Sequence, residues 1–242
     1  MRIAQLMLGK GFGGAERSFV DITNVLSDQG HELLVIVNRQ GISAPKINKG
    51  RNVNLVSVSC LGTWDCLSRV AIYRHFERFL PQIAHTHLAR ASAIGGKAAS
   101  DLGIHTVAKS HNLINPKYYR FVDRIVPTTR AQRSHLLKNG VSKERICLIP
   151  NFSTVNPVSK STIAGKQKTF SQREFVLRAA GRLVHKKGFD IFLEAVFILK
   201  SLNIKLRVEI AGDGPEREAL LTHRKLLGLE KEVSFLGWRE NI

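Results

Sequence analysis

The chain has 242 residues, enough for one large or two small domains, and its 43% hydrophobic content is sufficient for a packed core. Its formal net charge of +18 indicates an anionic partner such as nucleic acid, an acidic membrane surface or a phosphorylated ligand. Specific nucleic-acid recognition is poorly supported, because the sequence has no zinc-finger spacing, RNA-binding aromatic signature or long Lys/Arg block.

The cysteines and the N-terminus bear on where the protein works. Cys60, Cys66 and Cys147 form no CxxC pair, and an odd number of cysteines is typical of reduced thiols in a cytosolic protein. The N-terminal apolar run ends at Leu8, too short for a secretory signal, and no apolar run approaches the roughly eighteen residues of a membrane-spanning helix. We therefore expect a cytoplasmic protein with no metal site at its cysteines.

The first part of the chain alternates predicted strands with predicted helices. Strands are expected at 2–8, 32–37, 53–58, 83–87, 105–109, 123–127 and 145–149, and helices at 16–27, 66–80, 89–102 and 131–138. Two parallel strands must be joined by a crossover connection, and the sequence supplies one between nearly every pair of successive strands. This pattern predicts a six- or seven-stranded α/β domain over residues 1–150, which opens with a nucleotide-binding βαβ unit.

The turn after the first strand contains a formal G-x-G-x-x-G at Gly9, Gly11 and Gly14. Alone this match is weak, because glycine-rich turns serve many phosphate and sugar ligands. A dinucleotide enzyme would place an acidic residue after the second strand, where this chain has Asn38 and Arg39. These residues argue against NAD and leave an NADP-dependent oxidoreductase as an alternative, since arginine can accept a 2′-phosphate.

The predicted helix at 66–80 has apolar residues on one side and Arg69, Arg74 and Arg78 on the other. Such a helix typically faces the core of a sheet domain. The alternative interpretation is a helix that lies on anionic lipid, with its arginines at the headgroups and Trp64 near the interface.

Histidines gather at predicted carboxyl ends of strands, where ligands bind in open α/β sheets. His85 and His87 lie on one face of their strand, because strand side chains repeat every two residues. Two such histidines could ligate a metal, but no third ligand of suitable spacing accompanies them. The next strand delivers His111 to the same edge.

Residues 151–173 are rich in Ser, Thr, Lys and Pro and contain few large apolar residues, so we expect an interdomain linker there. A second βαβ pattern occupies residues 174–242, with strands at 175–180, 205–211 and 232–236 and helices at 189–202 and 216–227. The strand at 175–180 is apolar apart from Arg178 and is expected to be buried.

A basic loop follows the strand at 175–180 and precedes the next helix, a position where backbone N–H groups make a natural anion site. Arg182 can grip phosphate in a bidentate way and Lys187 adds a point charge, which suits a diphosphate better than a neutral ligand. The alternative is that both are solvated loop cations. Gly212 and Gly214 mark a further tight turn at a carboxyl edge.

These short motifs together resemble the retaining glycosyltransferases of family 4, which have the GT-B fold. The motifs are G-G-A-E at 13–16, I-x-H-x-H at 83–87, a strand ending in His111, I-P-N at 149–151, G-R-L-x-x-x-K-G at 181–188, G-D-G-P at 212–215 and F-L-G at 235–237. Any one motif is weak. The set is specific, because in order and spacing it covers essentially the whole chain.

The resemblance implies a GT-B-like α/β fold with two Rossmann-type parallel-sheet domains. It also implies transfer of a sugar from a nucleotide-sugar donor, with retention and with neither a cofactor nor an obligatory metal. The acceptor would be a cell-envelope glycan or glycolipid at the inner face of the membrane. By the same match the donor is bound by Gly13, Gly14, Arg182, Lys187, Gly212 and Gly214, the catalytic histidine facing the sugar is His111, and the acceptor-side candidates are Glu16 and His87.

The chain also departs from the family pattern. Phe152 stands where members carry the glycine of P-N-G, and Gln82 stands where they carry an acid. The family's second domain continues to a glutamate pair spaced E-x₇-E, which has no counterpart after Phe235. We therefore expect an incomplete second domain with an apolar edge at 175–180 and low stability. The alternative to an active transferase is a catalytically inactive fragment that acts only as a binding module.

Overall fold

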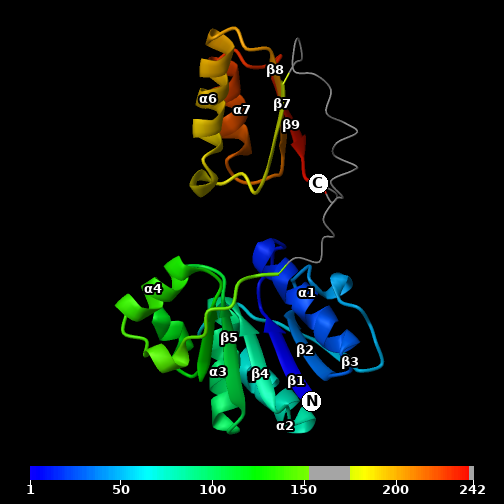
Figure 1. The fold of residues 1–242 in the computed structure, drawn as a ribbon. Coiled ribbons are helices and arrows are strands. Elements are labelled where there is room, and N and C mark those ends of the chain that lie inside the picture. The colour runs from blue at the N-terminus through cyan, green and yellow to red at the C-terminus, as the bar shows by residue number, and fades with distance from the viewer. Residues whose placement is uncertain (153–174, 240–242) are drawn as a thin grey trace, which may run out of the picture. The chain divides into compact units, whose positions relative to one another are not determined.

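The computed structural model of the protein describes residues 1–152 and 175–239. The chain divides into two compact units, Met1–Asn156 (unit 1) and Pro157–Ile242 (unit 2), and each is described by itself. Most of the predicted linker at 151–173 lies outside the described residues. Both units are built on parallel strands joined by helices, as the α/β prediction requires (Figure 1).

Unit 1 contains six parallel strands in the order β3-β2-β1-β4-β5-β6 (Figure 1). This is the strand order of a doubly wound nucleotide-binding sheet, in which the direction of progression reverses next to β1. The strands are β1 (Arg2–Met7), β2 (Glu32–Asn38), β3 (Val53–Val58), β4 (Ile83–His87), β5 (His105–Ser110) and β6 (Arg124–Pro127). The inner strands β1 and β2 are almost entirely buried, as their continuous apolar runs predict.

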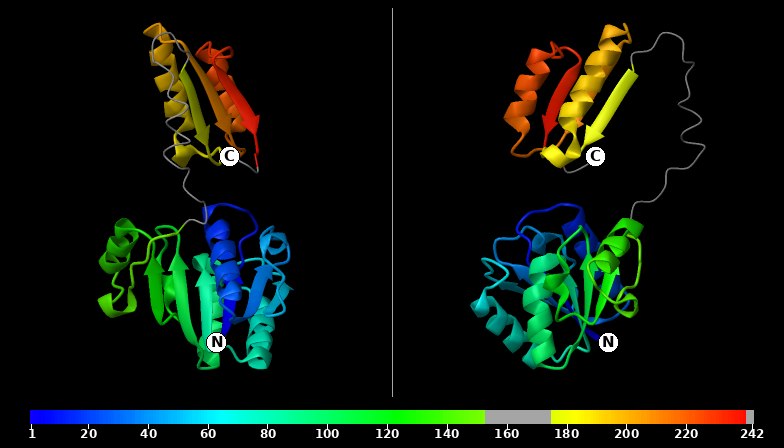
Figure 2. Two further views of the ribbon diagram at one scale, coloured as in Figure 1. Left: turned by 45° about the vertical axis from the view of Figure 1, so that its right-hand side comes forward. Right: turned by 90° about the vertical axis from the view of Figure 1, so that its left-hand side faces the viewer.

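Helices cover both faces of this sheet (Figures 1 and 2). The helices are α1 (Gly14–Asp28), α2 (Cys66–Phe79), α3 (Leu88–Asp101) and α4 (Arg130–Lys138), with single turns η1 (Ala44–Lys46), η2 (Pro116–Tyr119) and η3 (Lys143–Arg145). Phe19 of α1 packs in one cluster with Met7, whereas Ile72 of α2 packs in another with Leu6. Since neighbouring strand residues point to opposite faces, α1 lies on one face and α2 on the other.

The predicted strand at 145–149 is wrong. This segment forms one parallel bridge, Ile125 to Ile146, and two further backbone hydrogen bonds to β6, from Cys147 N–H to Ile125 and from Ile149 N–H to Pro127. It runs beside the edge of the sheet without building a ladder, so the sheet has six strands.

Helix α2 faces the core through Ile72 and Phe76, as the first interpretation of residues 66–80 predicted. Three apolar residues expected on that face lie elsewhere, because Leu67 is 84%, Leu80 is 57% and Val70 is 43% exposed. Leu80 follows the last residue of α2 in a left-handed conformation, which turns it away from the helix's buried side. Within the described residues, no helix combines the length and apolarity that crossing a bilayer requires.

Unit 2 contains three parallel strands in the order β7-β8-β9, with β7 at Phe175–Ala180, β8 at Leu206–Ala211 and β9 at Val233–Gly237. Two helices accompany them, α6 (Phe189–Ser201) and α7 (Arg217–Leu226). Leu193 and Leu220 of these helices pack in one core with Val208 and Ile210 of β8. The alternation of apolar and polar residues along β8 matches a sheet with one covered face.

Strand β7 lies at the edge of this sheet, and its expected burial is wrong. Phe175 and Val176 are 49% and 41% exposed. The apolar run of this strand cannot tell an edge position from a central one, because both favour β-branched and aromatic residues. The expectation of an apolar edge at this strand is met in the described part of the chain.

Candidate functional site

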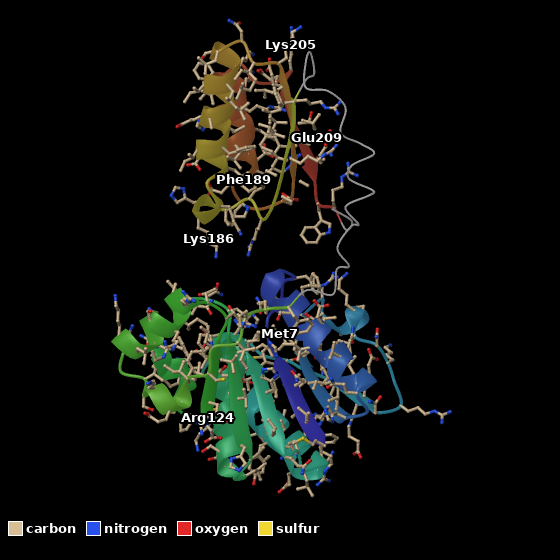
Figure 3. The ribbon with its side chains drawn as sticks, in the orientation of Figure 1. Met7, Arg124, Lys186, Phe189, Lys205 and Glu209 are labelled. Carbon is tan, nitrogen blue, oxygen red and sulfur yellow. The ribbon has the colours of Figure 1, made fainter. Side chains whose placement is uncertain are left out.

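The carboxyl ends of β1, β4 and β5 meet at one edge of the sheet of unit 1, and the predicted residues of this unit lie there. β1 leads into the glycine loop, in which Gly13 is the N-cap of α1 and Gly14 is its first residue. His87 is the last residue of β4, and His111 directly follows β5. Met7 at the end of β1 marks this edge in Figure 3.

Glu16 shapes the glycine loop. Its Oε2 accepts a hydrogen bond from the Gly13 N–H at 3.0 Å, and a Cβ on Gly9 would come within 2.7 Å of its Oε1. An acid in the first turn also suits the positive end of the helix dipole. The structure thus gives Glu16 a capping role, and its contact with an acceptor stays a prediction.

A chain of hydrogen bonds links His111 to the interior of the sheet. Nε2 of His111 lies 3.2 Å from Nδ1 of His87, and Nε2 of His87 lies 3.2 Å from Oε1 of Gln5. The amide nitrogen of Gln5 lies 3.1 Å from Nδ1 of His85. The parallel register places Gln5 opposite His85 and Met7 opposite His87, so the Gln5 amide reaches both histidines of β4.

The Gln5 amide assigns the proton on each ring. Its oxygen only accepts, so His87 donates from Nε2, and a neutral His87 then accepts at Nδ1 from the Nε2–H of His111. Its nitrogen only donates, so His85 accepts at Nδ1. The unprotonated nitrogen of His111 is therefore Nδ1.

All three rings are neutral at pH 7. Burial, followed by the nearby positive charge of Lys109, lowers the pKa of His111 to about 4. The same two causes lower the pKa of His85 to about 3. Burial holds the pKa of the fully buried His87 well below its usual value. A neutral His111 can exchange hydrogen bonds with a hydroxyl group without placing a positive charge beside it.

Sequence reasoning misses three side chains near this edge: Gln5, Arg90 and Lys109. Arg90 donates to the carbonyl oxygen of Leu8 at 3.1 Å and so ties α3 to the end of β1. Lys109 is only 4% exposed, and burial lowers its pKa. For Gln5 and Lys109 the available signal was a polar residue inside a strand, because a buried polar group requires a partner.

In unit 2 the basic loop joins β7 to α6 as predicted. It contains the turn η4 (His185–Lys187), and Gly188, with φ of 65°, is the N-cap of α6. Leu183 is fully buried and anchors the loop in the core. Arg182 and Lys187 are exposed, and neither side chain has an ion pair or hydrogen bond to any other residue in 1–152 or 175–239.

The turn at Gly212 and Gly214 packs backbone to backbone against this loop. A Cβ on Gly212, where φ is 138°, would lie 1.9 Å from the carbonyl oxygen of Gly181, and a Cβ on Gly214 would lie 2.3 Å from that of Leu183. The Leu183 N–H donates to the carbonyl oxygen of Asp213 at 2.9 Å. The two glycines therefore hold the backbone that carries Arg182, and their own contact with a donor stays a prediction.

The predicted site residues thus form two groups, one in each unit. The unit 1 group consists of Gly13, Gly14, Glu16, His87 and His111, and the unit 2 group consists of Arg182, Lys187, Gly212 and Gly214. In residues 1–152 and 175–239, no three His, Cys, Asp or Glu side chains gather in a way that could hold a metal ion.

Two parallel-sheet units, with glycine turns, histidines and basic residues at carboxyl edges, define a protein of the nucleotide-binding α/β class. Comparison with family models then identifies the family. Residues 12–154 match the model for Glycosyltransferase Family 4, and residues 161–242 match that for Glycosyl transferases group 1. The chain belongs to glycosyltransferase family 4, as its motifs indicated.

Two relatives from Rhizobium meliloti (strain 1021) match nearly the whole chain. The lipopolysaccharide core biosynthesis glycosyltransferase LpsD is 28% identical over 95% of this chain and 64% of its own length. LpsE, which has the same description, is 29% identical over 100% of this chain and 68% of its own length. The chain therefore spans about two thirds of the length of these relatives.

Solved structures show the same fold. Anabaena HepE in complex with UDP and glucose has a TM-score of 0.77 at 21% identity, over 99% of this chain and 70% of that one. The lipopolysaccharide outer core galactosyltransferase WaaB has a TM-score of 0.68 at 17% identity, and the match covers 99% of this chain and 69% of WaaB. These likenesses confirm the GT-B-like fold class, with unit 2 covering part of the corresponding domain.

Asn38, which stands where a dinucleotide enzyme would carry an acid, has a structural role. Asn38 is 1% exposed, and its amide nitrogen donates to the carbonyl oxygens of Leu8 and Cys60 at 3.2 and 3.1 Å. It holds together the loops that follow β1 and β3. The NADP alternative depended on the glycine turn and Arg39, and the family assignment argues against it.

Proposed function

We propose that the protein transfers a sugar, with retention, from a nucleotide-sugar donor to a glycan or glycolipid acceptor. Its relatives LpsD and LpsE are described as lipopolysaccharide core glycosyltransferases, and HepE has been solved with UDP, with UDP-glucose, and with UDP and glucose. A glycolipid acceptor places the reaction at a membrane surface, to which a net charge of +18 is attracted when the lipids are anionic.

The observation that carries the proposal is the loop between β7 and α6. It presents Arg182 and Lys187, both exposed, at the start of a helix of thirteen residues. As the bond between the sugar and the diphosphate breaks, negative charge develops on the departing nucleoside diphosphate. Two cations and the helix N-terminus stabilise that charge more in the transition state than in the ground state.

His111 supports the transfer from unit 1. The chain through His87 to Gln5 fixes its ring, so its Nδ1 can accept a hydrogen bond from a hydroxyl of the transferred sugar. The acceptor hydroxyl forms the new bond to the anomeric carbon as the bond to the diphosphate breaks, and its proton passes to an oxygen of the departing diphosphate. His111 can play this role as a neutral ring, so the proposed reaction needs no charged side chain next to the sugar.

Calorimetric titration of the full chain with UDP and with UDP-glucose tests the proposal. Arg182→Ala and Lys187→Ala are each expected to weaken UDP binding about tenfold, since each removes a charge-assisted contact to the diphosphate. Lys205→Ala is the matched control. It removes the same charge from the same unit, and Lys205 lies at the opposite end from Lys186 of the basic loop (Figure 3).

Unchanged UDP affinity in both loop variants would remove the assigned roles of Arg182 and Lys187. Tight binding of NADPH with none of UDP would return the oxidoreductase alternative. Release of UDP that depends on an added glycan separates a transferase from the alternative of a binding module, which binds donor and releases nothing.

A further inference from the structure

A groove on unit 1 shares no residue with the glycine loop or the histidine chain. It has a volume of about 180 Å³ and lies between the turn before α2, one side of α3 and the segment around η2. Its lining includes the cations Arg69, Lys97, Lys117 and Arg120 and the aromatic residues Trp64, Tyr118 and Phe121. The lining thus combines cationic with aromatic side chains, and none of the roles described above uses it.

The charge of the groove is positive. Its cations are Arg69, Lys97, Lys117 and Arg120. Lys97 pairs with Asp101 on the next turn of α3, whereas the other three have no ion pair with a residue that the structure describes. The single acid of the lining, Asp65, accepts hydrogen bonds from the N–H groups of Leu61 and Ser68 at 3.0 Å, which make it the N-cap of α2.

Aromatic rings hold the cations and offer flat apolar faces. The guanidinium carbon of Arg120 lies 4.5 Å from the ring centre of Phe121, and Nζ of Lys117 lies 5.3 Å from that of Tyr118. Such contacts position a cation without neutralising it. Trp64 adds a further ring that is 80% exposed. The groove is therefore suited to a ligand with both an anionic group and an apolar face.

We propose that this groove binds the saccharide of the acceptor and that the saccharide carries a phosphate ester. The inference rests on the proposed function and adds the charge of the substrate to it. The cations hold the phosphate through charge-assisted hydrogen bonds, and the rings pack against the apolar face of the sugar. A lipid surface is the competing partner, because Leu61 and Leu67 beside Trp64 are 82% and 84% exposed. The concave shape favours the sugar phosphate.

Trp64 reports on binding directly, because the chain has only two tryptophans. In a Trp238→Phe background, the fluorescence of Trp64 is titrated with glucose 6-phosphate, with glucose and with inorganic phosphate. We expect glucose 6-phosphate to bind about tenfold more tightly than either part, since it engages both the cations and the rings. Equal affinity for glucose and glucose 6-phosphate would overturn the proposal.

Charge variants locate the ligand. Arg69→Gln with Lys117→Gln is expected to weaken glucose 6-phosphate binding about tenfold, whereas Lys49→Gln, an exposed loop cation outside the groove, leaves it unchanged. The sugar site would be refuted if the groove variant and Lys49→Gln lost the same affinity for glucose 6-phosphate. It would also be refuted if Trp64 fluorescence responded to phosphatidylglycerol vesicles but not to glucose 6-phosphate. UDP binding is measured in the same variants. If the protein binds glucose 6-phosphate but does not bind UDP, the proposed function is refuted, whereas the assignment of the groove as a sugar-phosphate site is not.

Discussion

Acidification is expected to destabilise unit 1 strongly between pH 6.5 and pH 5. The pKa of His85 is lowered to about 3 and that of His111 to about 4, and burial places the pKa of His87 well below its usual value. In the unfolded chain all three titrate near 6.5. Below pH 6.5 the unfolded state therefore binds more protons than the folded state, so stability is fully present above pH 6.5 and is lost as the pH falls towards the folded pKa values.

The magnitude follows from these values. At pH 5, each unfolded histidine is stabilised by protonation by about 2 kcal/mol, and the folded rings remain neutral. Three rings together remove about 6 kcal/mol, a large part of the 5–15 kcal/mol of an ordinary domain. Carboxylates with lowered pKa, such as Asp65, lose their contribution only below about pH 4, outside this window.

The assay is urea unfolding at pH 7.5 and pH 5.0, followed by a brief hydrogen-exchange pulse at one fixed pH and mass spectrometry. Peptides from β4 and β5 report on unit 1, and peptides from β8 serve as the internal reference. His85→Asn, whose amide oxygen can still accept from Gln5, is expected to recover about 2 kcal/mol of the loss at pH 5. His105→Gln, at a histidine whose side chain is 86% exposed, is the matched control. A loss below about 1 kcal/mol in the wild type would refute the reasoning.

Two further predictions concern single contacts, and a third concerns the small size of unit 2. Gly214→Ala places a Cβ against the backbone of Leu183 and is expected to destabilise unit 2 by about 2–4 kcal/mol in urea, whereas Gly11→Ala, in open space, is expected to change the stability of unit 1 by less than 1 kcal/mol. Gln5→Leu breaks the histidine chain, so nitrogen NMR of His111 should change from a pure Nε2–H tautomer to a mixture; an unchanged spectrum would contradict the proton assignment. Residues 175–237 should exchange amide hydrogens faster than residues 3–37, and equal protection would disprove the low stability expected of unit 2.

The strands and helices of both units could be predicted because their signals are local. Local sequence patterns placed β1, β2, β4 and β8 within a residue or two of their observed bounds, with glycines near β1, β2 and β8. The basic loop before α6 could be placed for the same reason, since a strand, a glycine-bounded turn and a helix follow one another in the sequence.

Features that depend on register or on the position of a strand in its sheet could not be predicted. The contact between Gln5 and His87 joins residues 82 positions apart, and it exists only because β1 and β4 pair in one particular register. The exposure of β7 depends on which strands flank it, so the apolar edge was expected only from the comparison with the family pattern, whereas the strand's own residues suggested burial. The packing of Gly214 against Leu183 likewise needs two loops to meet.

The charges of the proposed site residues, taken within each unit separately, suit the chemistry of the proposed reaction. Glycosyl transfer passes through a sugar with oxocarbenium character, so positive charge grows on the sugar while negative charge grows on the leaving diphosphate. In the proposed reaction, Arg182 and Lys187 are the cations that hold the diphosphate. A protonated imidazole beside the sugar would oppose the reaction, and burial together with Lys109 prevents its formation by lowering the pKa of His111 to about 4. On this view the buried Lys109, which forms no ion pair with a described residue, helps to keep the ring of His111 neutral.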